Sequence, residues 1–183
     1  MLQFLKHILQ LMLSPAKGWE DVSQASEAPA ELCSRGLYPL LGIAALSNFV
    51  RMLYGNGILL VTAIERAVVD FGTYFSAYFL AALILEQLMP NIVSGEPNRK
   101  KIETCSVYII AMLCIIRIIE NCVPAELTLI KLLPVFVALI VYKADRYLAV
   151  KPGDDIRFML IGVIALILMP LLLHYVLFLL IPA

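Results

Sequence analysis

The chain has 183 residues, of which 62% are hydrophobic and only 15% are charged. A soluble domain has about 25% charged and 45–50% apolar residues, so this composition indicates a protein that folds in a lipid bilayer. Lysine plus arginine equals aspartate plus glutamate, at 14 each, and this balance excludes the strongly basic character typical of nucleic-acid binding. We therefore expect the bilayer as a partner and no nucleic acid.

The N-terminal segment begins with a short apolar stretch, residues 1–13, in which polar residues recur at helical spacing. This pattern is typical of an amphipathic helix that lies in the membrane interface. A signal peptide with a cleavage site at residues 23–25 is the alternative, although its n-region has only one lysine, and glutamines and Lys6 interrupt the apolar run. Trp19, the only tryptophan, suits an anchor at the headgroup level. We treat residues 1–36 as a cytoplasmic or interfacial segment.

Five apolar segments follow, and they predict an all-α polytopic membrane protein, a bundle of five transmembrane helices within residues 37–183. The last segment is the clearest, because it has no formally charged side chain and would extend about 36 Å, more than the roughly 30 Å hydrocarbon core. Pro170 near its middle predicts a kink. The predicted spans are 37–54, 68–89, 105–123, 127–142 and 158–181.

Basic residues predict the orientation, since short loops rich in lysine and arginine stay in the cytoplasm. Loops are expected at residues 54–57 and 90–103, and a basic turn at 143–157. With the N-terminus inside, most basic residues lie on the cytoplasmic side, and the C-terminus is outside the inner (plasma) membrane. The residues expected to determine topology and to contact anionic lipids are Arg99, Lys100, Lys101, Lys143, Arg146, Lys151 and Arg157.

Charged residues also occur in or beside the outer ends of the predicted spans. Arg66 with Asp70, and Arg117 with Glu120, are spaced so that each pair can meet on one helix face. Charges at membrane depth are costly and usually face a bundle interior or a water-filled cavity. Either they form a polar vestibule, or they are ion-paired ends of helices. This candidate intramembrane polar cluster comprises Glu65, Arg66, Asp70, Arg117, Glu120 and Lys131.

The sequence offers no catalytic motif. The four cysteines lack C-x-x-C spacing, the two histidines lie at opposite ends of the chain, and no P-loop, zinc-protease or serine-hydrolase motif occurs. Asp154 and Asp155 are adjacent before the fifth span, where they suit a helix cap rather than an intramembrane protease. His174, on an apolar helix, suits a hydrogen-bonded packing residue. We predict no catalytic, cofactor-binding or metal-binding residues, and no cofactor.

Several features of the chain recur together in one family. Pro15-x-x-x-Trp19 precedes the first span, a short loop with Gly95 joins the second and third, and a turn bearing lysine and aspartate precedes a long apolar fifth span. In these features the chain resembles the Yip1 family of membrane proteins. The resemblance implies five helices and a cytoplasmic N-terminus, and eukaryotic relatives act in vesicle traffic and contact Rab GTPases. Here the N-terminal segment is short and the eukaryotic Asp-Leu-Tyr-Gly-Pro signature is absent, which favours a compact bacterial member and argues against a Rab partner.

Two functions from different classes remain. The leading hypothesis is a non-enzymatic membrane scaffold that acts by helix packing, as a homo-oligomer or with another membrane protein; Gly72-x-x-x-Ser76 and Ala77-x-x-x-Ala81 have the spacing of close helix contacts. The alternative is a small transporter or channel for an ion, a proton or a lipid. A shared cavity among the six charges would favour transport, and separate, locally paired helix ends would favour the scaffold.

Overall fold

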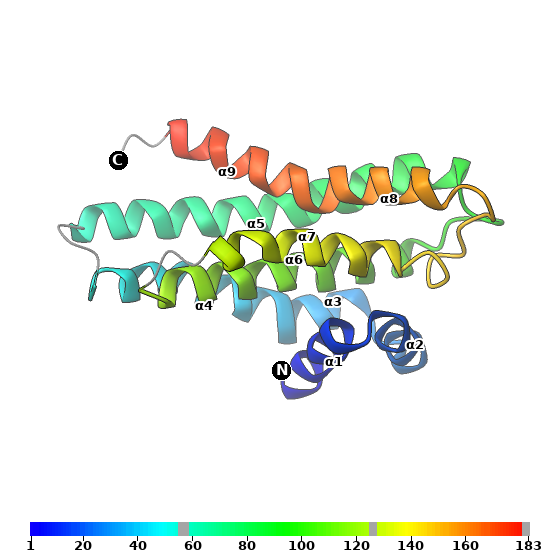
Figure 1. The fold of residues 1–183 in the computed structure, drawn as a ribbon, viewed down its shortest axis with the longest axis horizontal. Coiled ribbons are helices and arrows are strands. Elements are labelled where there is room, and N and C mark those ends of the chain that lie inside the picture. The colour runs from blue at the N-terminus through cyan, green and yellow to red at the C-terminus, as the bar shows by residue number, and fades with distance from the viewer. Residues whose placement is uncertain (55–58, 125–127, 181–183) are drawn as a thin grey trace.

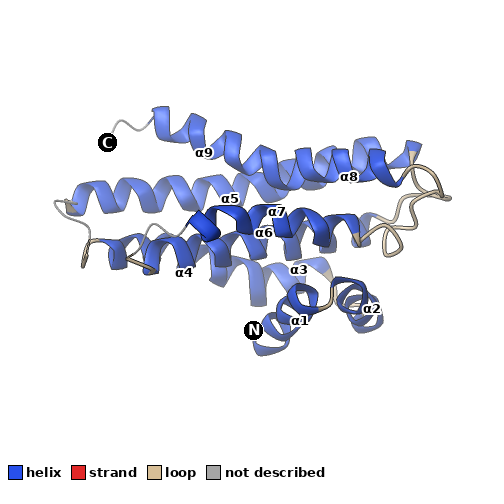
Figure 2. Cartoon of the chain, viewed as in Figure 1, coloured by secondary structure: helices blue, strands red, loops and turns tan. Residues whose placement is uncertain are grey.

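The computed structural model describes residues 1–54, 59–124 and 128–180, with the backbone alone for 128–131. Over these residues the chain is almost entirely helical, joined by short loops (Figure 2), and it contains no strand longer than one isolated bridge. This agrees with the predicted all-α class.

Five helical segments run along a common axis in alternating directions (Figure 1). The first joins α3 (Pro29–Leu32), a π-helical turn η1 (Cys33–Leu37) and α4 (Tyr38–Arg51). The second is α5 (Leu60–Leu88) with the short η2 (Met89–Asn91). The third is α6 (Arg99–Cys122) and the fourth is α7 (Thr128–Tyr142). The fifth joins α8 (Asp155–Val163), a π-helical turn η3 (Ile164–Leu168) and α9 (Met169–Leu180).

Three helices of the described chain are long and apolar enough to cross a membrane: Leu60–Asn91, Arg99–Cys122 and Asp155–Leu180. At 1.5 Å per residue they extend about 48, 36 and 39 Å, each more than a hydrocarbon core of roughly 30 Å. These helices mark the chain as a membrane protein. The apolar α7 has 15 residues, about 22 Å, which is too short to cross by length alone.

The helices extend beyond the predicted spans at several ends. In particular, Arg99, Lys100 and Lys101 were expected in a loop and instead form the first turn of α6. Asn98 explains this start, because its side chain accepts a hydrogen bond from the backbone N–H of Lys101 at 3.3 Å. A hydropathy pattern detects only the apolar part of such a helix. The turn expected at 54–57 lies mostly outside the described residues, as do Leu127 and Ile181.

Two N-terminal helices, α1 (Leu2–Leu13) and α2 (Pro15–Ala25), flank the bundle. In Figure 1 they lie across its side rather than along its axis. α1 buries Phe4, Ile8 and Leu11 against the bundle, and the ring of Phe4 stacks on Tyr108 of α6 with centroids 5.0 Å apart. A second apolar edge stays open, with Leu2 87% and Leu13 76% exposed. The place of this second edge in the membrane interface stays a prediction.

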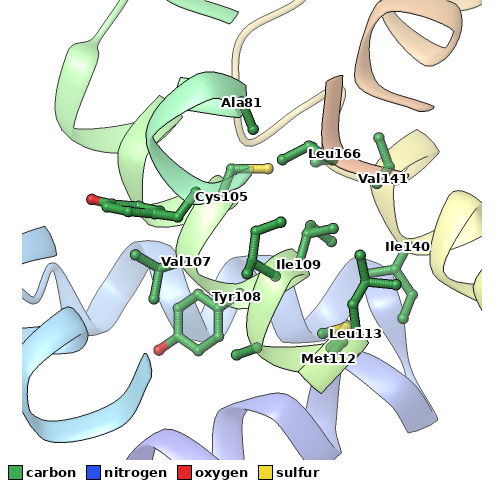
Figure 3. Packing of buried hydrophobic residues seen from close by; sticks show 14 of the residues in the cluster. Ala81, Cys105, Val107, Tyr108, Ile109, Met112, Leu113, Ile140, Val141 and Leu166 are labelled. Carbon is green, nitrogen blue, oxygen red and sulfur yellow. The ribbon is translucent and has the colours of Figure 1, made fainter. Parts of the chain in front are cut away.

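The core is centred on α6. Every residue from Thr104 to Leu113 is buried, and 72% of its most apolar stretch lies inside the protein, against 22% for Asp155–Leu180. A helix that is apolar on all sides is expected at the centre of a bundle. Figure 3 shows its side chains packed among residues of three neighbouring elements: Ala81 of α5, Ile140 and Val141 of α7, and Leu166 of η3.

The loops at one end of the bundle are joined to each other. Val93, in the loop between α5 and α6, forms an antiparallel bridge with Val150, in the turn between α7 and α8. The N–H of Ser94 donates to the carbonyl of Ala149 at 2.8 Å, and the N–H of Lys151 donates to the carbonyl of Ile92 at 2.9 Å. This loop clamp ties two helical hairpins together at that end.

Candidate functional site: a buried polar centre

The most unusual group of side chains is a set of charges within the apolar bundle. Asp70 of α5 is fully buried. The Nε of Arg117, on α6, donates to both of its carboxylate oxygens, at 3.0 and 2.9 Å. Asn48 of α4 adds a third hydrogen bond, from Nδ2 to Oδ2 at 2.7 Å. Ionised groups are tolerated in such surroundings only when paired and hydrogen-bonded, and Asp70 meets both conditions.

Two further titratable residues lie beside this pair. The Nη1 of Arg117 is 3.3 Å from Oε2 of Glu120, one turn further along α6. The Nδ1 of His174, on α9, is 3.5 Å from Oδ1 of Asp70. We call these five residues, Asn48, Asp70, Arg117, Glu120 and His174, the polar centre. It joins α4, α5, α6 and α9.

A second set of polar contacts lies next to the polar centre, between α4 and α6. The Nδ2 of Asn121 donates to the hydroxyl of Ser47 at 2.9 Å, and the hydroxyl of Tyr54 donates to the carbonyl of Asn121. Three buried oxygens, on α4, α5 and α6, have no hydrogen-bond partner within the described chain: Oδ1 of Asn48, Oγ1 of Thr73 and Oδ1 of Asn121. Such groups are points where water or a bound ligand is accommodated, since leaving one unsatisfied costs about 1–3 kcal/mol.

A small cavity adjoins the polar centre. Its volume is about 90 Å³, and Arg117, Glu120 and His174 form its polar wall. Two prolines, Pro134 of α7 and Pro170 of α9, are also part of the lining. Because a water molecule takes about 30 Å³ of liquid volume, the cavity has room for a few waters or a small ion.

The structure places the six predicted cluster residues in different surroundings. Asp70, Arg117 and Glu120 come together in the polar centre. Glu65 and Arg66 lie about one turn earlier on α5, half-buried, and neither forms an ion pair with any side chain described. The side chain of Lys131 lies outside the described residues. Asp70 thus pairs across helices with Arg117 rather than with Arg66 on its own helix.

Sequence reasoning missed part of the centre. Asn48 of the centre and Asn121 beside it lie within helices and are not among the predicted residues, and His174 is predicted only as a hydrogen-bonded packing residue. The available signal was the presence of amides in an apolar helix, where every polar side chain needs a partner. Among the residues described, no group of three His, Cys, Asp or Glu side chains is arranged to hold a metal ion.

The seven predicted topology residues gather at the opposite end of the bundle, around the loop clamp (Figure 1). Some are paired: Arg99 contacts Glu86 at 2.9 Å and Glu103 at 2.8 Å, and Arg157 contacts Asp154 at 3.1 Å. Lys151 donates to the backbone carbonyl of Asn91 at 3.3 Å. Of the remaining four, Lys101, Lys143 and Arg146 line one pocket, and Lys100 lines another.

Comparisons with protein-family models, with curated proteins and with solved structures find no significant match. The resemblance to the Yip1 family therefore stays a prediction from the sequence.

Proposed function

We propose that this chain is a non-enzymatic, five-span protein of the bacterial inner membrane, and that its polar centre binds and passes a proton or another small ion. In this arrangement the N-terminus is cytoplasmic and the C-terminus is outside. Two observations support this arrangement: the five helical segments alternate in direction, and the basic residues gather at one end of the bundle. The short α7 then crosses with help from its neighbours, α6 and α8.

The observation that supports transport is the shared cavity. Glu120 and His174, which come from two helices, face the same 90 Å³ space beside the buried Asp70–Arg117 pair. Ionisable groups that meet at a cavity inside a membrane protein commonly mark ion pathways and proton relays. The size of the cavity favours a proton or small ion over the lipid that the sequence also allowed.

The two prolines in the cavity wall fit this proposal. Pro170 is the second residue after the π-helical turn η3, and π-helical turns and prolines interrupt the regular hydrogen bonding of a helix. Pro134 interrupts the hydrogen bonding of α7 in the same way. Helices that are interrupted beside a polar cavity provide backbone groups that can bind an ion.

The test is ion flux in proteoliposomes that contain the full chain and a pH-sensitive dye. Under an imposed membrane potential, we expect proton flux that falls at least tenfold in Glu120→Gln. Glu86→Gln is the matched control, because Glu86 pairs with Arg99 at the other end of the bundle, and its flux should be unchanged. Size-exclusion profiles must match for both variants. If neither protons nor small monovalent ions show a flux that depends on Glu120, transport through the centre is excluded.

A membrane scaffold is the second candidate, and one surface favours it. Phe71, Phe75 and Phe79 form a row on α5, are 39–49% exposed, and lie with successive ring centroids 5.8 and 5.1 Å apart. Such a row offers a rigid face to another membrane helix. The small residues Ala77 and Ala81 cannot contact another membrane helix in this way, because both are fully buried inside the bundle. In-membrane crosslinking from Phe75 would recover a second copy or another membrane protein if this candidate holds.

A further inference from the structure

A second pocket lies at the basic end of the bundle, far from the polar centre. It is about 440 Å³ in volume and is enclosed by α2, the first turn of α6, the end of α7 and the turn that follows. This volume falls in the range of ligand sites, about 300–1,000 Å³. Its lining combines aromatic rings with positive charges: Trp19, Lys101, Tyr142, Lys143, Arg146 and Tyr147.

The aromatic part of the lining is fixed in place. Trp19 and Tyr147 are 2% and 8% exposed, and their rings stack with centroids 5.0 Å apart at an interplanar angle of 23°. The indole Nε1 of Trp19 donates to the carbonyl of Ile140 at 3.0 Å. Burial raises the pKa of the Tyr147 phenol, so this ring stays neutral at physiological pH. The pocket therefore has a preformed, uncharged floor.

Two of the pocket's cations lie over aromatic rings of its lining. The Nζ of Lys101 lies 5.3 Å from the centre of the Tyr147 ring, and the Nζ of Lys143 lies 5.2 Å from the centre of the Tyr142 ring. Cation–π contacts of this kind restrain a lysine without neutralising it. Arg146 belongs to the same lining.

Unlike Arg99 and Arg157 at the same end of the bundle, these three cations have no carboxylate partner within the described chain. Two acids also line the pocket, Glu20 and Asp145. Asp145 accepts a hydrogen bond from the backbone N–H of Arg146 at 2.7 Å, so it holds the turn. The lining keeps a net positive charge of three cations against two carboxylates, and it suits an anion with several acceptor oxygens.

We propose that this pocket binds the phosphate of an anionic phospholipid headgroup. Lysine, arginine, tryptophan and tyrosine are the residues that proteins place at the membrane–water interface on the side of anionic lipids. Of the seven basic residues expected to contact anionic lipids, three thus form one binding site. It is independent of ion transport at the polar centre.

Trp19 provides the measurement, because it is the only tryptophan and forms the pocket floor. The full chain in uncharged detergent micelles is titrated with phosphatidylglycerol, with phosphatidylcholine and with inorganic phosphate, while Trp19 emission is recorded. We expect a saturable change with phosphatidylglycerol and none of comparable affinity with the other two. A phosphatidylcholine response of equal affinity would show that charge plays no part. An equal response to inorganic phosphate would identify a soluble anion as the ligand and overturn the lipid proposal.

Charge-removing variants locate the site. Lys143→Gln and Arg146→Gln change exposed side chains, and each should weaken phosphatidylglycerol binding about fivefold, the usual effect of one basic residue near an anionic surface. Arg157→Gln removes the same charge at the same end outside the pocket, and its affinity should match the parent protein. If all three variants weaken binding equally, the lipid responds to the general charge of this end and the pocket is not its site.

Discussion

Removing Arg117 tests whether the Asp70–Arg117 pair holds the bundle together. In Arg117→Met, a side chain of similar length replaces the guanidinium, and the carboxylate of Asp70 stays buried with Asn48 as its only close polar partner apart from His174. Both oxygens of Asp70 lose a donor, at 3.0 and 2.9 Å in the parent protein. The variant therefore isolates the cost of a buried, unpaired charge.

The expected loss is large because Asp70 is fully buried. Deleting one partner of a buried ion pair costs about 3–5 kcal/mol, since the remaining charge is left without compensation. Removing both charges, in Asp70→Asn with Arg117→Met, avoids that penalty. We expect the double variant to regain most of the loss and to lie within about 1–2 kcal/mol of the parent protein.

The assay is reversible unfolding of the full chain in mixed micelles of mild and denaturing detergent, followed by circular dichroism. Arg99→Met is the control, because Arg99 is 75% exposed in its ion pairs and should change stability by at most about 1 kcal/mol. Asp70→Asn and Arg117→Met are also measured singly. If the stability lost by the double variant equals the sum of these two single losses within about 0.5 kcal/mol, the two residues are not coupled. The assignment of this pair as the central tie would then be wrong.

Two further predictions use the same assay. In Gly162→Ala the new Cβ would lie 2.5 Å from Cγ1 of Val141, so we expect overpacking to lower stability by about 1–3 kcal/mol. Gly42→Ala is the control: its Cβ would have no atom within 4 Å, and its stability should be unchanged or rise by up to about 1 kcal/mol. Equal effects of the two variants would contradict the close α7–α8 packing. Trp19→Phe keeps an aromatic ring beside Tyr147 but removes the hydrogen bond to Ile140, so we expect stability to fall by about 0.5–1.5 kcal/mol. An unchanged unfolding midpoint would mean that this hydrogen bond does not hold α2 to α7.

The helical class and the approximate positions of α1 and of the five apolar helical segments could be predicted because membrane helices follow length and hydropathy. The starts of α5 and α6 could not be obtained this way. The first turn of α5 is apolar, but the charged residues Glu65 and Arg66 follow it and interrupt the hydropathy pattern. The first turn of α6 is charged and is held by capping and backbone hydrogen bonds rather than by apolar side chains. For α6 the necessary signal was Asn98, a residue that favours helix starts.

The polar centre was predictable only in part. Arg117 and Glu120 are on one helix, and their contact follows from helical spacing. Asp70 and Arg117 are 47 residues apart, and no local rule selects this pairing over Arg66 on the same helix as Asp70. The choice depends on how α5 and α6 rotate about their axes, which the surrounding apolar packing determines.

The loop clamp between Val93 and Val150 has a mechanical consequence. If one hairpin, α5 and α6, rotates relative to the other, α7 with α8 and α9, the clamp is the pivot. The cavity lies between these hairpins, with Arg117 and Glu120 on one and Pro134, Pro170 and His174 on the other. His174 is about 29 Å along its helix from the start of α8, so a rotation of only about 5° at the pivot displaces it by about 2.5 Å. A shift of that size would part His174 from Asp70 and widen the cavity while the basic end stays closed.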